Sequence, residues 1–159
     1  MNINLTSKER TLLEDQKSHE EICIQKYSNY ANQASDQQLR DMFNNHAKIE
    51  QEHLNSINQL LSGQVPALNS QQGGGSGNQQ QQQSQQPQNT AVNLQTSDKD
   101  LCTDILMTEK YVSGTYDTAI FEFRDTQVRD VLNHIQKEEQ KHGEAVFKYM
   151  ESKGMYSPQ

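Results

Sequence analysis

The chain contains only two cysteines among its 159 residues, Cys23 and Cys102, and neither lies in a CxxC motif. Two thiols cannot hold a fold of this size together by disulfides. We therefore interpret both as small core residues. Cross-linking to other chains through these thiols stays open as an alternative.

Long apolar runs and an excess of basic residues are also missing. No stretch of 18 apolar residues exists, and the opening MNINLTSKER lacks the apolar segment of a secretory signal. The net charge of -7 and the pI of about 5.2 argue against non-specific binding to nucleic acid or to anionic membranes. We expect no nucleic-acid partner, no membrane association, and synthesis in a cytosol-like compartment.

Hydrophobic residues are absent from the whole of 69–90, which contains GGGSG and a run of five glutamines. Such a segment cannot bury enough surface to offset the entropy lost on ordering. We predict a flexible connector over 62–97 that separates two helical halves.

Apolar residues on either side of this connector recur at helical spacing, and no stretch shows the alternation of a strand. Asp36 and Asp125 are placed to cap the second helix of each half, Ser97-Asp98 to cap the third helix, and Gly63 followed by Pro66 to end the first half. The pattern predicts an all-α protein with helices over 6–34, 36–61, 98–123 and 125–152.

The length of the connector indicates how the halves are joined. A helix of about 26 residues spans roughly 39 Å, and a flexible connector over 62–97 has a typical reach of about 33 Å. A crossover along the bundle would make the second and third helices parallel, as in a ferritin-like four-helix bundle. We predict one domain over 1–159, in which helical hairpins at 6–61 and 98–153 are joined by the crossover.

The two halves are an internal repeat with an offset of 89 residues. Aligning 12–53 with 101–142 without a gap gives 13 identities in 42 positions. Each half carries one lone Glu and, 30 residues later, a Glu-x-x-His motif, which is the ligand pattern of a di-metal carboxylate site in a four-helix bundle. The repeated pairs include Glu20/Glu109, Tyr27/Tyr116, Glu50/Glu139 and His53/His142.

The six acidic and imidazole residues satisfy two tests for a metal site. They lie on the apolar helix faces, where a lone charge would be costly, and the four carboxylates lie 15 residues from their hairpin turns and so meet at mid-bundle. Their charge of about -4 would be cancelled by two divalent ions, and the donors suit iron or manganese, and also zinc. The alternative is a decayed site whose polar groups hydrogen-bond one another. The predicted ligands are Glu20, Glu50, His53, Glu109, Glu139 and His142.

Tyr27 and Tyr116 follow the lone Glu of each half by two helical turns on the same face. Their hydroxyls are placed to hydrogen-bond the Glu ligands of the facing hairpin, and core packing is the alternative role. His46 also lies on an apolar face but has Ile135 at its related position. For His46 we weigh a core role against a ligand role.

The second half closely resembles the Coat F domain of endospore-forming bacteria. The resemblance is carried by TEKY, the stretch Tyr116-Asp117-x-Ala119, EEQKHGE, and the ending YMESKGMY. It implies a ferritin-like fold and a place in the spore coat, which is assembled inside the mother cell, with other coat proteins as partners and homo-oligomers open. The ligand pattern is similar to that of rubrerythrin-like and manganese-catalase-like proteins, but the resemblance implies no particular reaction.

The leading hypothesis is a structural spore coat protein of the Coat F type that retains a di-metal site. The alternative is a di-iron or di-manganese oxidoreductase that scavenges peroxide or oxygen, and a third is a metal-free interaction module. No catalytic residue is assigned. The tyrosines, the two thiols and the glutamines of 79–86 are further candidates for cross-linking within the coat.

Overall fold

The computed structural model describes residues 3–67 and 96–158, and within them the chain forms four α-helices and no strand. The predicted all-α class is therefore confirmed for the described residues, and each helix boundary lies within one residue of the predicted one. The connector expected over 62–97 lies largely outside the described residues. The helices are α1 (Ser7–Gln33), α2 (Gln37–Leu61), α3 (Asp98–Glu122) and α4 (Thr126–Ser152).

The helix ends follow from local capping chemistry. The Oδ1 atom of Asp36 accepts a hydrogen bond of 2.7 Å from the Gln38 amide, and Asp125 accepts one of 2.8 Å from the Gln127 amide. Each carboxylate thereby satisfies an amide that the first helical turn leaves free. After α2, Gly63 takes the left-handed conformation with φ of 87° and turns the chain.

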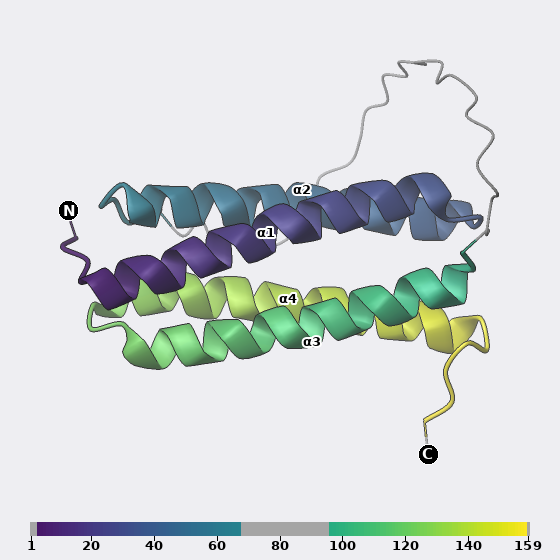
Figure 1. The fold of residues 1–159 in the computed structure, drawn as a ribbon. Helices are drawn as coiled ribbons and strands as arrows, with labels where there is room; N and C mark the ends of the chain where they lie inside the picture. Colours follow the sequence, from purple (N-terminus) through teal and green to yellow (C-terminus); the bar gives the residue numbers. More distant parts are fainter. Residues whose placement is uncertain (1–2, 68–95, 159) are drawn as a thin grey trace, which may run out of the picture.

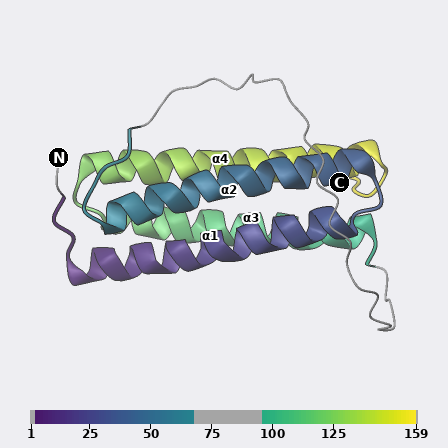
Figure 2. The ribbon, with the colours of Figure 1, turned by 90° about the horizontal axis from the view of Figure 1, so that it is seen from above.

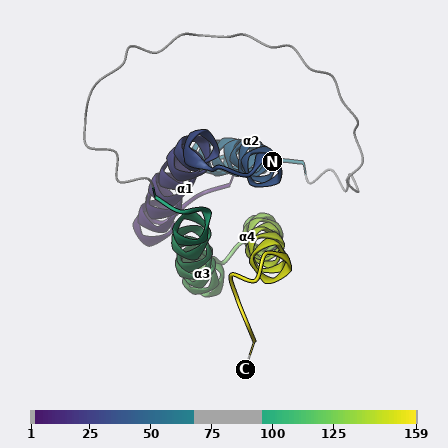
Figure 3. The same ribbon diagram turned by 90° about the vertical axis from the view of Figure 1, so that its right-hand side faces the viewer.

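The helices form a bundle of two antiparallel hairpins. Figure 1 shows that α2 and α3 run in the same direction, as the crossover length led us to expect. α1 contacts α2 and α3, and α4 contacts α3 and α2, so the parallel helices lie diagonally opposite. Figures 2 and 3 show this arrangement from above and along the bundle.

The interior has two apolar clusters near the two ends of the bundle. One gathers Leu13, Cys23 and Ile57 with the buried residues of the α3–α4 turn region, and the other includes Phe43 and Cys102. Both cysteines are free thiols and are buried, which agrees with their interpretation as core residues. Between the two clusters the helices contribute buried acidic and imidazole side chains in place of apolar ones.

The two hairpins are also joined at each end of the bundle. Glu9, at the start of α1, accepts a hydrogen bond of 3.1 Å from the backbone amide of Arg124 in the opposite hairpin turn. Asp98, 89 positions later at the start of α3, accepts one of 2.7 Å from the amide of Ser35. Each first-turn carboxylate therefore closes the turn of the other hairpin, which fixes how the hairpins are aligned along the bundle.

Candidate metal centre

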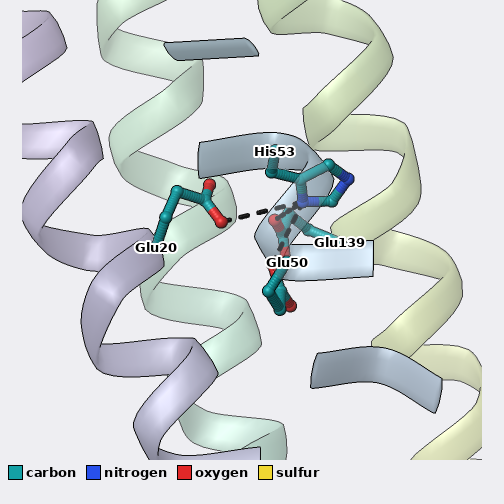
Figure 4. Close-up of side chains that lie close together, drawn as sticks. All are labelled: Glu20, Glu50, His53 and Glu139. Carbon is teal, nitrogen blue, oxygen red and sulfur yellow. Dashed lines mark hydrogen bonds and ion pairs between the residues drawn. The ribbon is translucent and has the colours of Figure 1, made fainter. Parts of the chain in front are cut away.

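The six predicted ligands come together in the middle of the bundle. Glu20 is supplied by α1, Glu109 by α3, and one Glu-x-x-His pair by each of α2 and α4. None of the six residues is more than 3 % exposed. Figure 4 shows four of them converging from three helices. The structure thus brings into one cluster all the residues that the sequence pattern singled out.

The imidazole of His53 faces the carboxylates through Nδ1. This atom lies 3.0 Å from Oε2 of Glu50, 3.0 Å from Oε1 of Glu139 and 3.7 Å from Oε2 of Glu20. The pair Glu50 and His53 share a helix face because residues three apart are neighbours on an α-helix.

His142 repeats this arrangement on α4. Its Nδ1 lies 2.9 Å from Oε1 of Glu50, 3.7 Å from Oε1 of Glu109 and 3.7 Å from Oε2 of Glu139. The same ring atom of both histidines is therefore turned toward the carboxylates.

The donor atoms fall into two groups that share two carboxylates. In each group the potential ligand atoms lie within 4.8 Å of one another. Glu50 and Glu139 belong to both groups, so they are placed to bridge two ions, whereas each remaining Glu and His serves one ion. The first donor group is Glu20, Glu50, His53 and Glu139, and the second donor group is Glu50, Glu109, Glu139 and His142.

Two buried tyrosines hold the unshared carboxylates from the opposite hairpin. The hydroxyl of Tyr27 on α1 donates a hydrogen bond to Glu109, and that of Tyr116 on α3 donates one to Glu20. Burial raises the pKa of both phenols well above the usual value. Both tyrosines therefore stay neutral donors that orient Glu109 and Glu20.

Burial and crowding of like charges set the protonation of the cluster. Burial raises the pKa of Glu20 to about 8 and that of Glu109 well above its usual range. Burial opposes charge on the imidazole of His142 as well, but the surrounding carboxylates raise its pKa to about 11. When no cation is bound, protons on these groups balance the remaining carboxylates.

The unsatisfied oxygens of the cluster suit divalent metal ions. One oxygen of Glu20, one of Glu109 and both of Glu139 are buried and accept no hydrogen bond from the described part of the chain, although Nδ1 of His53 lies 3.0 Å from Oε1 of Glu139. Buried carboxylate oxygens without donors are costly unless a proton or a cation binds them. Mixed carboxylate and imidazole donors suit iron, manganese and zinc.

The outer nitrogens of the two imidazoles have different surroundings. Nε2 of His53 lies 3.4 Å from Oε2 of Glu138, and the pKa of Glu138 is lowered to about 2 by this contact. Nε2 of His142 is buried without a hydrogen-bond partner in the described residues. Ile49 stands 89 positions before Glu138, so the second donor group lacks the corresponding carboxylate. The two donor groups are therefore not equivalent.

His46 lies beside the cluster without joining either donor group. Its ring stacks on that of His142 with 4.2 Å between centroids, and burial lowers its pKa to about 3. His46 is thus a neutral buried residue that packs against a member of the second donor group. Neither its contact with His142 nor that of Glu138 with His53 was predicted from the sequence. Both positions differ between the two halves, since His46 corresponds to Ile135 and Glu138 corresponds to Ile49.

The fold and the cluster together define an all-α bundle with a buried carboxylate and imidazole centre. The family model of the Coat F domain matches residues 97–159, which contain the second hairpin with Glu109, Glu139 and His142. This match supports the resemblance seen in the sequence and favours a spore coat protein. No curated protein and no solved structure matches the chain. Within the described residues, no helix is both long and apolar enough to cross a membrane.

Proposed function

We propose that this chain is a structural spore coat protein of the Coat F type, a ferritin-like bundle whose core binds two divalent metal ions. The main observation in favour of the metal centre is that the two donor groups share Glu50 and Glu139. Two bridging carboxylates, with one further carboxylate and one imidazole for each ion, provide charge balance and enough donors for both. The Coat F match over residues 97–159 supports the place in the coat.

The metal ions would stabilise the bundle because they neutralise carboxylates that repel one another in the core. A ligand that binds only the folded state raises the free energy of unfolding by an amount that grows with the logarithm of its concentration relative to its dissociation constant. The centre would therefore lock the two hairpins together at mid-bundle, where apolar packing is interrupted. Such a lock suits a protein built permanently into a shell with other coat proteins.

Elemental analysis of untagged protein purified without chelators tests the metal centre. We expect about two iron, manganese or zinc ions per chain, and loss of both in Glu50→Ala/Glu139→Ala, because these residues serve both donor groups. Glu52→Gln, an exposed position on the same helix, is the matched control. Less than about a tenth of an ion per chain after reconstitution would leave a metal-free scaffold.

A second candidate function is an oxidoreductase that reduces peroxide or oxygen. It is favoured by a solvent-open pocket whose lining includes Glu109 and Glu139 of the second donor group. Iron or manganese, when bound, would supply the redox chemistry, and the residues of the chain would hold the ions and exclude bulk water. Peroxide turnover by the loaded protein that is lost in Glu50→Ala/Glu139→Ala would establish this function.

A further inference from the structure

The second hairpin has a solvent-open pocket between α3 and α4 whose lining includes Glu109 and Glu139, while Oε2 of Glu109 and both oxygens of Glu139 stay buried behind it. Its volume is about 470 Å³, which lies in the range of small-molecule sites. Glu109 and Glu139 lie at its inner side with little exposed surface, and most of the exposed surface of the walls is apolar. The residues that line the pocket include Leu106, Glu109, Glu139, Gly143, Phe147 and Tyr156.

Gly143 keeps this pocket open. A Cβ atom at this position would lie 3.8 Å from Cδ1 of Leu106 and 3.9 Å from Cβ of Glu109, so a larger side chain would extend into the pocket. Leu54 stands 89 positions earlier, one residue after His53, just as Gly143 follows His142. The first hairpin therefore carries a leucine where the second has no side chain.

The C-terminal segment supplies the outer wall. Gly154 takes the left-handed conformation with φ of 68°, and the amide of Met155 donates a hydrogen bond of 2.8 Å to the carbonyl of Met150. The chain thereby turns back on α4, and the ring of Tyr156 meets that of Phe147 edge to face, with 5.1 Å between centroids. Two aromatic rings thus wall a pocket whose inner side is next to Glu109.

The ionisable side chains that line the pocket are mostly acidic. Glu109, Glu139 and Glu144 stand against one lysine, Lys110, so the lining offers an anion one cationic partner. Glu144 itself pairs with Lys148 at 2.5 Å. Leu106 and the two aromatic rings offer apolar contact to a flat molecule.

We propose that this pocket binds a small uncharged molecule with a flat apolar body, next to the second donor group. The effect of the bound molecule on a metal ion rests on the function proposed above, whereas the binding itself depends only on the pocket. Because Leu54 occupies the related position in the first hairpin, we expect no matching pocket there. A bound molecule would lie beside Glu109, which belongs to the second donor group alone, and beside Glu139, which both donor groups share.

Amide NMR of the ¹⁵N-labelled full chain tests the binding, with phenol as the neutral probe and benzoate as an anionic probe with the same ring. We expect phenol to cause saturable shifts at the amides of Leu106, Gly143 and Phe147, and benzoate to cause none there. Gly143→Leu should weaken phenol binding by at least about tenfold because it fills the pocket. Gly114→Leu is the matched control on α3, where a Cβ atom would have no other atom within 4 Å, and it should bind phenol like the wild type.

Absence of saturable shifts with phenol, equal binding of benzoate, or unchanged binding by Gly143→Leu would overturn the proposal. Gly143→Ala, which adds a single methyl group, shows whether any loss follows added volume. The visible spectrum of cobalt-loaded protein tests whether the pocket adjoins the metal centre. Phenol should change the spectrum of the wild type but not that of Gly143→Leu. A protein that binds phenol but no cobalt would disprove the metal centre and leave the pocket standing, whereas cobalt binding without phenol binding would do the reverse.

Discussion

The hydroxyl of Tyr27 on α1 donates a hydrogen bond to Oε1 of Glu109 on α3, and the two side chains belong to different hairpins. Tyr116, 89 positions after Tyr27, donates in the same way to Oε1 of Glu20. Both phenols are fully buried. The pair of hydrogen bonds therefore joins the hairpins and holds the two unshared carboxylates in the cluster.

Removing either hydroxyl should destabilise the protein. Tyr27→Phe and Tyr116→Phe should each lower the free energy of unfolding of the metal-free protein by about 1–3 kcal/mol, because each leaves a buried carboxylate oxygen without its donor. Urea denaturation followed by circular dichroism measures this change. Tyr111→Phe, at a ring that is 64 % exposed, is the control and should change little. Equal effects at all three tyrosines would contradict this role of the hydrogen bonds.

The contact between Glu138 and His53 predicts that the two metal positions differ in affinity. A carboxylate on the outer nitrogen of a ligating imidazole fixes its orientation and raises its basicity. The first donor group has this partner at 3.4 Å, and the second does not. When protein that a chelator has freed of metal is titrated with cobalt, it should therefore show two binding steps of unequal affinity. Glu138→Gln should weaken the tighter step by about 10–100-fold and leave the other unchanged.

The reverse substitution is a gain-of-function test of the same difference. Ile49→Glu places a carboxylate at the position related to Glu138 by the 89-residue offset. It should strengthen the weaker step and bring the two affinities closer together. Ile49→Gln is the matched control, because it has the same size without the charge. Two equal steps in the wild type would show that Glu138 does not distinguish the donor groups.

The helices were predictable because their signals are local. Asp36 and Asp125 cap the helices that the sequence assigned to them, since a capping carboxylate needs only the amides of the next few residues. The six cluster residues were predictable for a related reason. Their spacing from the hairpin turns fixes their level, and a Glu-x-x-His motif fixes their common face.

The surroundings of the cluster could not be predicted in the same way. Glu138 precedes the inward Glu139 and so lies about 100° around the helix, half-buried at the edge of the bundle. Whether such a residue reaches His53 depends on how α2 and α4 are rotated against each other, which no single helix encodes. The stacking of His46 on His142 has the same origin. The predicted flexible crossover lies mostly outside the described residues and stays a prediction.

Metal binding should become stronger as the pH rises. The pKa of His142 is raised to about 11 and that of Glu20 to about 8, so both groups carry protons at pH 7 when no cation is bound. Ligands must lose their protons to bind a metal, so the affinity should rise by about tenfold per pH unit for each proton released. Calorimetry in two buffers of different ionisation enthalpy counts these protons. Heats that do not depend on the buffer would contradict this protonation pattern.

Acid should remove the stabilisation that Glu9 provides between the hairpins. Burial alone would raise the pKa of Glu9, but hydrogen bonds from Arg124 and Thr6 outweigh it and lower the pKa to about 2. A group whose pKa is lower in the folded state stabilises the protein above its unfolded pKa, near 4.5, and loses this effect as the pH falls toward 2.

Glu9→Gln should therefore lower the free energy of unfolding at pH 7 by about 1–3 kcal/mol, and the difference from the wild type should shrink to near zero at about pH 2. Urea unfolding of both proteins across this pH range measures the difference. Glu14→Gln, an exposed position on the same helix, should follow the wild type throughout. If the difference in the free energy of unfolding between Glu9→Gln and the wild type stayed constant with pH, the contact with the Arg124 turn would depend on the shape of Glu9 rather than on its charge. The pH profile thus separates the ionic contribution of this contact from its packing.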